Sequence, residues 1–298
     1  MTTSPPAVRV SRLSKSYGPF DAVNDISFDI SPGETFALLG PNGAGKSSTI
    51  EILEGYRDRS EGDVLVLGED PQHAGLDWKA RIGIVLQSSG ESGNATVLEQ
   101  LRHFASLYPN PRQVDEVLAA VGLEEKAKTR IHKLSGGQQR RVDVALGIIG
   151  RPELLFLDEP TTGFDPEARH QFWDLIRTLK SEGTTILLTT HNLDEAAELS
   201  DRAGIIVGGK LIDIGAIGEL GGPAARTPVV RWQDADGVQQ ESRTETPARL
   251  VAQLARDLGG EPAELQVIRP SLEDIYLGLV RGHAAGSTSD TESTEVLA

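Results

Sequence analysis

Three glycines and a lysine form the first chemically informative pattern of the chain. Residues 40–47 match G-x-x-x-x-G-K-[ST] and lie between the apolar run 36–39 and a potentially helical stretch, 49–53. Glycines let successive backbone N–H groups point inward around phosphate oxygens, and a helix N-terminus adds partial positive charge. Lys46 would neutralise the β- and γ-phosphates of a nucleotide, and the Ser47 hydroxyl would ligate Mg²⁺. The residues predicted to line this phosphate site are Gly40, Asn42, Gly43, Gly45, Lys46, Ser47 and Ser48.

An apolar run that ends in two carboxylates is the second candidate. Residues 154–157 are Leu-Leu-Phe-Leu, and Asp158 and Glu159 follow them. An acidic residue at the carboxyl end of a buried strand lies where α/β sheets bind ligands. Asp158 would hold Mg²⁺, and Glu159 would orient or deprotonate an attacking water. Alone, the pair is at least as compatible with an acidic turn that meets solvent, but beside the phosphate pattern the catalytic interpretation is favoured.

These side chains need a sheet to position them, and the sequence supplies one. Short apolar runs are typical of parallel strands that are covered on both faces, whereas residues 26–30 alternate like a half-buried strand. Residues 96–99 have capping-box spacing and begin a helical pattern, and residues 166–180 predict a helix with proline in its first turn. The runs predicted as parallel strands are 36–39, 154–157, 186–188 and 205–207.

Residues 134–138, Leu-Ser-Gly-Gly-Gln, decide the class. They lie between Lys46 and Asp158, and the three patterns together resemble the ABC ATPases. The resemblance implies an α/β P-loop NTPase fold, with a mixed sheet that has a parallel core, an antiparallel subdomain and a helical subdomain that carries this signature. It also implies that two such domains meet head to tail. Each ATP would then lie between the phosphate loop of one domain and the signature of the other, formed by Ser135, Gly136, Gly137 and Gln138.

The same resemblance gives roles to four residues that would mean little alone. Tyr17 lies where the family carries an aromatic ring that stacks on adenine, and Gln87 resembles the glutamine that touches Mg²⁺ and senses the membrane subunit. Asp165 belongs to a segment that resembles the D-loop, and His191 resembles the switch histidine that contacts the γ-phosphate. Without the family, Tyr17 could equally be an ordinary buried tyrosine and His191 a structural histidine.

A finer resemblance concerns residues 139–166 and 270–277, which are similar to the daunorubicin-resistance and multidrug exporter ATPases. It implies a separate transmembrane permease, a place on the cytoplasmic face of the cell membrane, and a drug, antibiotic or lipid-like cargo. The second ATPase of the dimer would be another copy of the chain or a paralogue. Two alternatives stay open: an ABC ATPase that is not linked to transport, and the ATPase subunit of an importer.

Composition limits the partners. The 298 residues include 44 acidic and 29 basic residues, which gives a formal net charge of −15 and argues against binding a nucleic-acid backbone. There is no cysteine, so disulfides, thiolate catalysis and zinc fingers are excluded. No apolar run approaches the roughly 20 residues of a membrane helix, and no signal peptide is visible, so the membrane part is expected to belong to another polypeptide.

The sequence predicts three segments. Residues 1–221 form the ATP-binding domain, and composition changes around residues 221–223. Residues 222–282 predict a small α+β accessory domain, with strands at 229–232, 238–242 and 265–269, a helix at 247–258 and a capped short helix from Ser271. Residues 283–298 are rich in Ser, Thr, Ala, Gly and acidic side chains and predict a disordered tail.

Overall fold

The computed structural model describes residues 5–86, 94–234 and 236–292. The chain separates into two compact units, Met1–Ile214 and Gly215–Ala298. The division comes slightly before the boundary expected at 221/222, and strand β9 (Lys210–Ala216) crosses it. Within the described ranges, no helix combines the length and the apolar composition that crossing a membrane requires.

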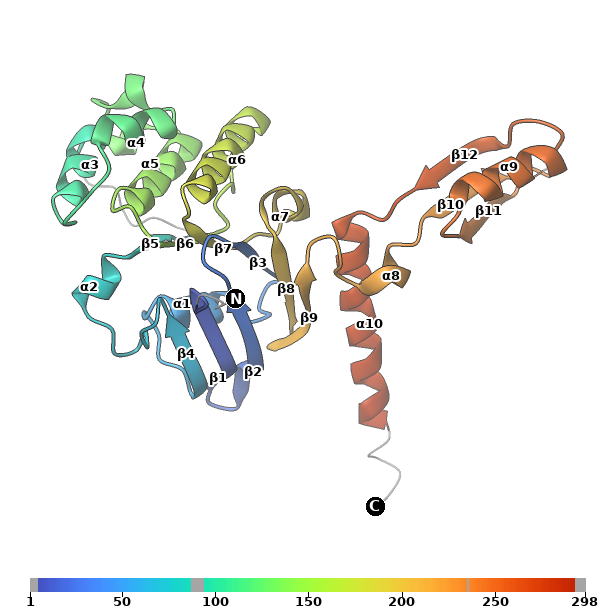
Figure 1. The fold of residues 1–298 in the computed structure, drawn as a ribbon, viewed down its shortest axis with the longest axis horizontal. Coiled ribbons are helices and arrows are strands. Elements are labelled where there is room, and N and C mark those ends of the chain that lie inside the picture. The colour runs from blue at the N-terminus through green and yellow to red at the C-terminus, as the bar shows by residue number, and fades with distance from the viewer. Residues whose placement is uncertain (1–4, 87–93, 235, 293–298) are drawn as a thin grey trace, which may run out of the picture. The chain divides into compact units, whose positions relative to one another are not determined.

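A six-stranded sheet forms the centre of the first unit, in the order β5-β6-β7-β3-β8-β9 (Figure 1). The neighbours from β5 to β8 pair in parallel, and the register places Asp158 beside Thr189. The four apolar runs predicted as parallel strands are all confirmed. Besides β9, the strands are β3 (Thr35–Leu39), β5 (Ile82–Val85), β6 (Leu154–Asp158), β7 (Thr185–Thr189) and β8 (Arg202–Val207).

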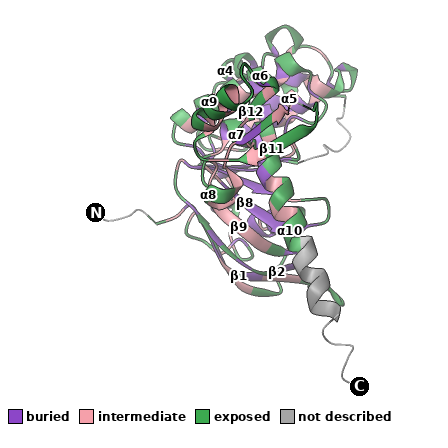
Figure 2. Cartoon of the chain, turned by 90° about the vertical axis from the view of Figure 1, so that its right-hand side faces the viewer, coloured by how far each residue is buried: buried purple, intermediate pink, exposed green. Residues whose placement is uncertain are grey.

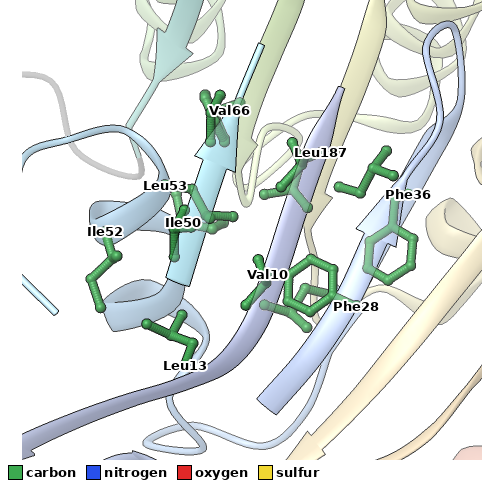
Figure 3. Packing of buried hydrophobic residues seen from close by; sticks show 14 of the residues in the cluster. Val10, Leu13, Phe28, Phe36, Ile50, Ile52, Leu53, Val66 and Leu187 are labelled. Carbon is green, nitrogen blue, oxygen red and sulfur yellow. The ribbon is translucent and has the colours of Figure 1, made fainter. Parts of the chain in front are cut away.

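A second, antiparallel sheet of three strands lies in the same unit, in the order β2-β1-β4. It contains β1 (Val8–Tyr17), β2 (Phe20–Ile30) and β4 (Glu61–Val66). Its apolar side chains pack with those of helix α1 (Lys46–Leu53) and of the central sheet into one core, and the rings of Phe28 and Phe36 stack with centroids 5.5 Å apart (Figure 3). This core fixes α1, which begins with the phosphate-site lysine.

Helices α3, α4, α5 and α6 lie together as a separate layer beside the parallel strands (Figure 1). The capping box predicted at Thr96 is confirmed, because Thr96 Oγ1 accepts from the N–H of Glu99 and the Glu99 carboxylate accepts from the N–H of Thr96. The remaining helices of the unit are α2 (Leu76–Lys79), α3 (Val97–Ala105), α4 (Val114–Ala120), η1 (Glu124–Lys126), η2 (Ile131–Lys133), α5 (Gly136–Ile148), α6 (Pro166–Ser181) and α7 (Leu193–Leu199).

Burial follows this layering. The inner residues of β8 are buried, whereas the edge strand β9 is mostly half-buried (Figure 2). The parallel core sheet, the antiparallel sheet and the helical layer confirm the predicted α/β P-loop architecture.

In its described residues, the second unit combines a three-stranded antiparallel sheet, in the order β11-β10-β12, with three helices. The predicted capped helix is confirmed, because Ser271 and Asp274 exchange hydrogen bonds at its start. That helix, α10, runs to Glu292 and so extends past His283, where the sequence predicts a disordered tail; the disorder of the tail stays a prediction. The elements are α8 (Gly222–Ala225), β10 (Val229–Gln233), β11 (Gln239–Arg243), α9 (Pro247–Asp257), β12 (Ala263–Ile268) and α10 (Leu272–Glu292).

Candidate functional site

The phosphate-site loop connects β3 to α1 and is shaped by its glycines. Gly43 and Gly45 have φ of 77° and 106°, which L side chains rarely adopt. A Cβ at Gly40 would lie 2.2 Å from the carbonyl oxygen of Ile206, and one at Gly45 would lie 2.2 Å from that of Ala22. The loop therefore requires glycine at these positions for conformation and for close approach of the backbone.

The Lys46 side chain folds back across this loop. Its ammonium donates to the carbonyl oxygens of Gly40 at 2.7 Å and Pro41 at 3.0 Å. Burial lowers the pKa of Lys46, and the negative charges of Glu159 and Asp158 oppose that shift. A buried cation beside two carboxylates, in a glycine-rich loop that leads into a helix N-terminus, is suited to hold a phosphate chain.

A hollow of about 800 Å³ brings the predicted catalytic residues together. Side chains from the phosphate loop, from the end of β6 and from the loop after β7 meet there, although they are far apart in sequence. Its lining is Tyr17, Phe20, Ala22, Asn42, Gly43, Gly45, Lys46, Ser47, Ser48, Arg57, Asp158, Glu159 and His191.

Glu159 is held in an uncommon backbone conformation at the end of β6. Its φ is 45°, and its N–H donates to the carbonyl oxygen of Thr189 at 3.0 Å. Its carboxylate lies 3.3 Å from Nδ1 of His191, and the Asp158 carboxylate accepts a hydrogen bond from the Thr189 hydroxyl. The left-handed torsion of Glu159 costs conformational energy, and the bond to Thr189 at the end of β7 holds it in place. This torsion turns the Glu159 carboxylate toward His191.

Tyr17 lies at the rim of the hollow and is 40% exposed. Its hydroxyl is 3.5 Å from the Ser48 hydroxyl, and the cationic groups of Lys15 and Arg57 lie 5.1 Å and 5.3 Å from its ring centroid. Arg57 also pairs with Glu51 at 2.5 Å. Sequence reasoning missed Arg57, because only the fold brings it over the ring.

The signature residues occupy a different hollow, of about 630 Å³, that shares no lining residue with the first. Ser135 is the N-cap of α5 and forms a capping box with Gln138. The Ser135 hydroxyl accepts from the N–H of Gln138 at 3.3 Å, and the Gln138 side-chain oxygen accepts from the N–H of Ser135 at 3.1 Å. The spacing S-x-x-Q could have indicated this helix start from the sequence. Asp165 borders the same hollow and caps α6, accepting from the N–H of Ala168 at 2.8 Å.

One chain therefore places the phosphate-loop residues and the signature residues at two separate hollows. Gln87, predicted to touch Mg²⁺, lies outside the described residues. The described strand that precedes it, β5, ends next to β6 in the parallel sheet.

Sequence comparison supports the resemblance to ABC ATPases. The family model described as ABC transporter matches residues 23–162. The chain is 44% identical over 215 residues to the Nod factor export ATP-binding protein I of Rhizobium johnstonii, covering 70% of this chain and 69% of that protein. It is 36% identical over 303 residues to the protein of the same name from Ralstonia nicotianae, covering 93% of this chain and 94% of the relative.

The fold has solved counterparts. A structure described as the ATP binding subunit of an ABC transporter superposes with a TM-score of 0.66 at 27% identity, covering 70% of this chain and 90% of that one. The superposed share is close to the share formed by the first unit, which holds the phosphate loop, the carboxylates and the signature. From the hollow around Lys46, the separate signature hollow and these relatives, we conclude that the chain belongs to the ABC transporter family, as an ATP-binding subunit.

Proposed function

We propose that the chain hydrolyses ATP with Mg²⁺ and that this turnover drives export through a separate membrane-spanning partner. The observation that carries the proposal is the convergence of Lys46, Asp158, Glu159 and His191 on one hollow. A cation for phosphate, a strand-end carboxylate and a carboxylate–imidazole pair are the groups that phosphoryl transfer to water requires.

Each residue has a role that its surroundings support. Lys46 would exchange the carbonyl oxygens of Gly40 and Pro41 for phosphate oxygens, which suit its charge better. Glu159 would orient the attacking water and accept its proton. His191, whose Nδ1 lies 3.3 Å from the Glu159 carboxylate, would contact the γ-phosphate. Tyr17, exposed at the rim, would stack on the adenine ring.

The hollow also fits a magnesium ion. The Ser47 hydroxyl and the Asp158 carboxylate both line it and offer hard oxygen ligands, which Mg²⁺ prefers alongside water and phosphate oxygens. Bound there, Mg²⁺ would supply positive charge to the phosphate chain. Thr189, which donates to Asp158, would keep that carboxylate oriented. Gln87 is proposed as a further ligand.

The separation of the two hollows supports a head-to-tail dimer. The signature presents a helix N-terminus and the backbone N–H groups of Gly136 and Gly137, which suit a phosphate chain, but they line a hollow that lacks Lys46. A second chain, either another copy or a paralogue, would place its signature over the bound ATP. Asp165 borders the signature and would lie at the same interface.

The relatives support export as the direction of transport, since both are named as Nod factor export proteins. We accordingly place the chain on the cytoplasmic face of the membrane, held there by its permease. The cargo is proposed to be a drug-like, antibiotic or lipid-like molecule, because of the resemblance of residues 139–166 and 270–277 to exporters of such compounds.

Two substitutions test the catalytic assignment. Lys46→Ala removes the main cation for the phosphate chain, so ATP binding or hydrolysis should be lost. Glu159→Gln keeps the shape but removes the base, so ATP should still bind and hold two chains together with little turnover. The measurements are Mg²⁺-dependent phosphate release and size-exclusion chromatography with and without ATP.

Glu116→Gln, at an exposed position on α4, is the control and should behave like the wild type. Full activity of Lys46→Ala would refute the phosphate site, and a Glu159→Gln dimer that ignores ATP would refute the head-to-tail arrangement. The link to transport is tested by purifying the tagged chain from detergent-solubilised membranes. A multi-span protein should co-purify, and its repeated absence would contradict the exporter assignment.

A further inference from the structure

A buried arginine joins the signature helix to the catalytic loop. Arg140 lies in the second turn of α5, shortly after the signature, and is 6% exposed. Its side chain points into the unit, toward the ends of β5 and β6. A buried guanidinium is costly unless its donors are satisfied, so its partners show what the position does.

The Arg140 donors bond backbone carbonyl oxygens of two separate segments, and Nη1 also lies 4.0 Å from the Asp143 carboxylate on the same helix. Nε donates to Pro160 at 3.1 Å, and Nη2 donates to Asp158 at 2.5 Å and to Glu159 at 3.3 Å. Nη1 donates to Leu86, the residue after β5 and directly before Gln87. One planar fork thus holds the backbone around the proposed catalytic glutamate and the strand end that leads to the proposed magnesium glutamine.

Arg140 donates to the main-chain carbonyl oxygen of Glu159. The Glu159 carboxylate, which lines the hollow, lies 3.3 Å from Nδ1 of His191 and accepts from the Thr162 hydroxyl at 3.4 Å. The backbone of the catalytic loop is therefore tied to the signature helix.

We propose that Arg140 is a positioning residue for hydrolysis, which makes the placement of Glu159 follow the position of the signature helix. The signature of one chain is expected to contact ATP held by the other, so α5 would report that contact to its own chain's catalytic loop. The proposal rests on ATP turnover as the proposed function. It concerns the rate of the chemical step, since the Arg140 donors recorded in the described residues reach the hollow around Lys46 only at main-chain atoms of Asp158 and Glu159, although Arg140 also borders the signature hollow.

Arg140→Met removes all four hydrogen bonds while keeping an unbranched apolar side chain. Misplacing a catalytic group by a fraction of an ångström to an ångström costs up to about a hundredfold in rate. We expect kcat to fall by about tenfold to a hundredfold, with the KM for ATP and the affinity for nucleotide nearly unchanged. Arg140→Lys keeps one charge but lacks the fork, so its kcat should lie between those of Arg140→Met and the wild type.

Arg112→Met is the matched control. Arg112 is also a largely buried guanidinium, with a side chain 16% exposed, but it pairs with Glu182, away from both hollows. Its loss should lower stability without changing kcat. An equal fall in kcat for Arg112→Met, or a wild-type kcat in either Arg140 variant, would overturn the proposal.

Amide hydrogen exchange of the nucleotide-free protein separates this inference from the proposed function. Arg140→Met should accelerate exchange in peptides that cover residues 154–162, and Arg112→Met should not. If the wild type failed to hydrolyse ATP, the proposed function would fail, while the exchange result would still decide whether Arg140 holds the loop. Unchanged exchange in this segment would contradict the inference.

Discussion

Glu54 shows how strongly burial near the Asp158 carboxylate shifts the pKa of a single residue. It directly follows α1, is only 6% exposed, and has a pKa raised from 4.5 to about 8. Burial is the largest cause, followed by repulsion from the negative charges of Asp158 and Glu51. At neutral pH this carboxyl, which is not among the residues that line the hollow, is mainly protonated.

This shift predicts a pH-dependent stability. Between about pH 4.5 and 8 the folded chain keeps a proton that the unfolded chain releases, so the contribution of Glu54 to stability falls as pH rises through this window. Glu54→Gln does not titrate, so its stability advantage over the wild type should grow as pH rises, to on the order of 5 kcal/mol at pH 9, and should be much smaller at pH 5. Thermal unfolding with EDTA and without nucleotide measures the difference, and a gap independent of pH would contradict it.

Residue roles were predictable from sequence only where a motif carried them. Lys46, Asp158, Glu159 and His191 were named from local patterns and a family resemblance, and the structure brings them to one hollow. Arg57 and Arg140 were not, because their contacts join segments far apart in the chain and no local pattern records them. The left-handed torsion of Glu159 was equally invisible, since it depends on its bond to Thr189 across two strands.

At the scale of elements, the strands and caps were the predictable part. Apolar runs marked β3, β6, β7 and β8 because strands of a covered parallel sheet need apolar side chains on both faces. Element ends were less predictable, as α10 shows: the sequence indicated a short helix from Ser271, and the helix extends to Glu292. Composition alone does not settle whether a helix that has already begun stops.

The phosphate loop offers a prediction that separates torsion from contact. Gly43 and Gly45 both have positive φ, but a Cβ at Gly43 meets nothing within 4 Å, while one at Gly45 would lie 2.2 Å from the Ala22 carbonyl oxygen. Gly43→Ala should cost about 1–2 kcal/mol of loop strain. Gly45→Ala carries a similar strain and must also displace β2 or α1, so it should weaken nucleotide binding far more.

Isothermal titration with ATP compares the two alanine variants, and circular dichroism checks that both fold. The wild type sets the reference affinity in the same buffer. Equal affinities for Gly43→Ala and Gly45→Ala would show that the close approach of Gly45 to β2 does not shape the loop.

At the scale of the whole molecule, the chemistry and the second unit are separate. All residues that line the hollow around Lys46, and all that line the signature hollow, lie within Met1–Ile214. The second unit has a small core of its own, in which Val230 and Ile275 are nearly inaccessible. The Ralstonia nicotianae relative matches 93% of this chain, so its similarity extends into the second unit. A shared segment outside the chemistry suggests a role in assembly or coupling.

Truncation after Gly221 tests that division. We expect the shortened chain to bind ATP with nearly wild-type affinity, because no residue of either hollow is removed. The resting dimer or the coupling of turnover to transport should weaken. A unit of this size rarely folds stably on its own core alone, so we expect it to pack against another surface in the assembly. Nucleotide titration and light scattering on full-length and truncated chains measure the two properties separately. Loss of ATP binding in a folded truncated chain would contradict the division, and unchanged dimerisation and transport would reduce the second unit to a passive appendage.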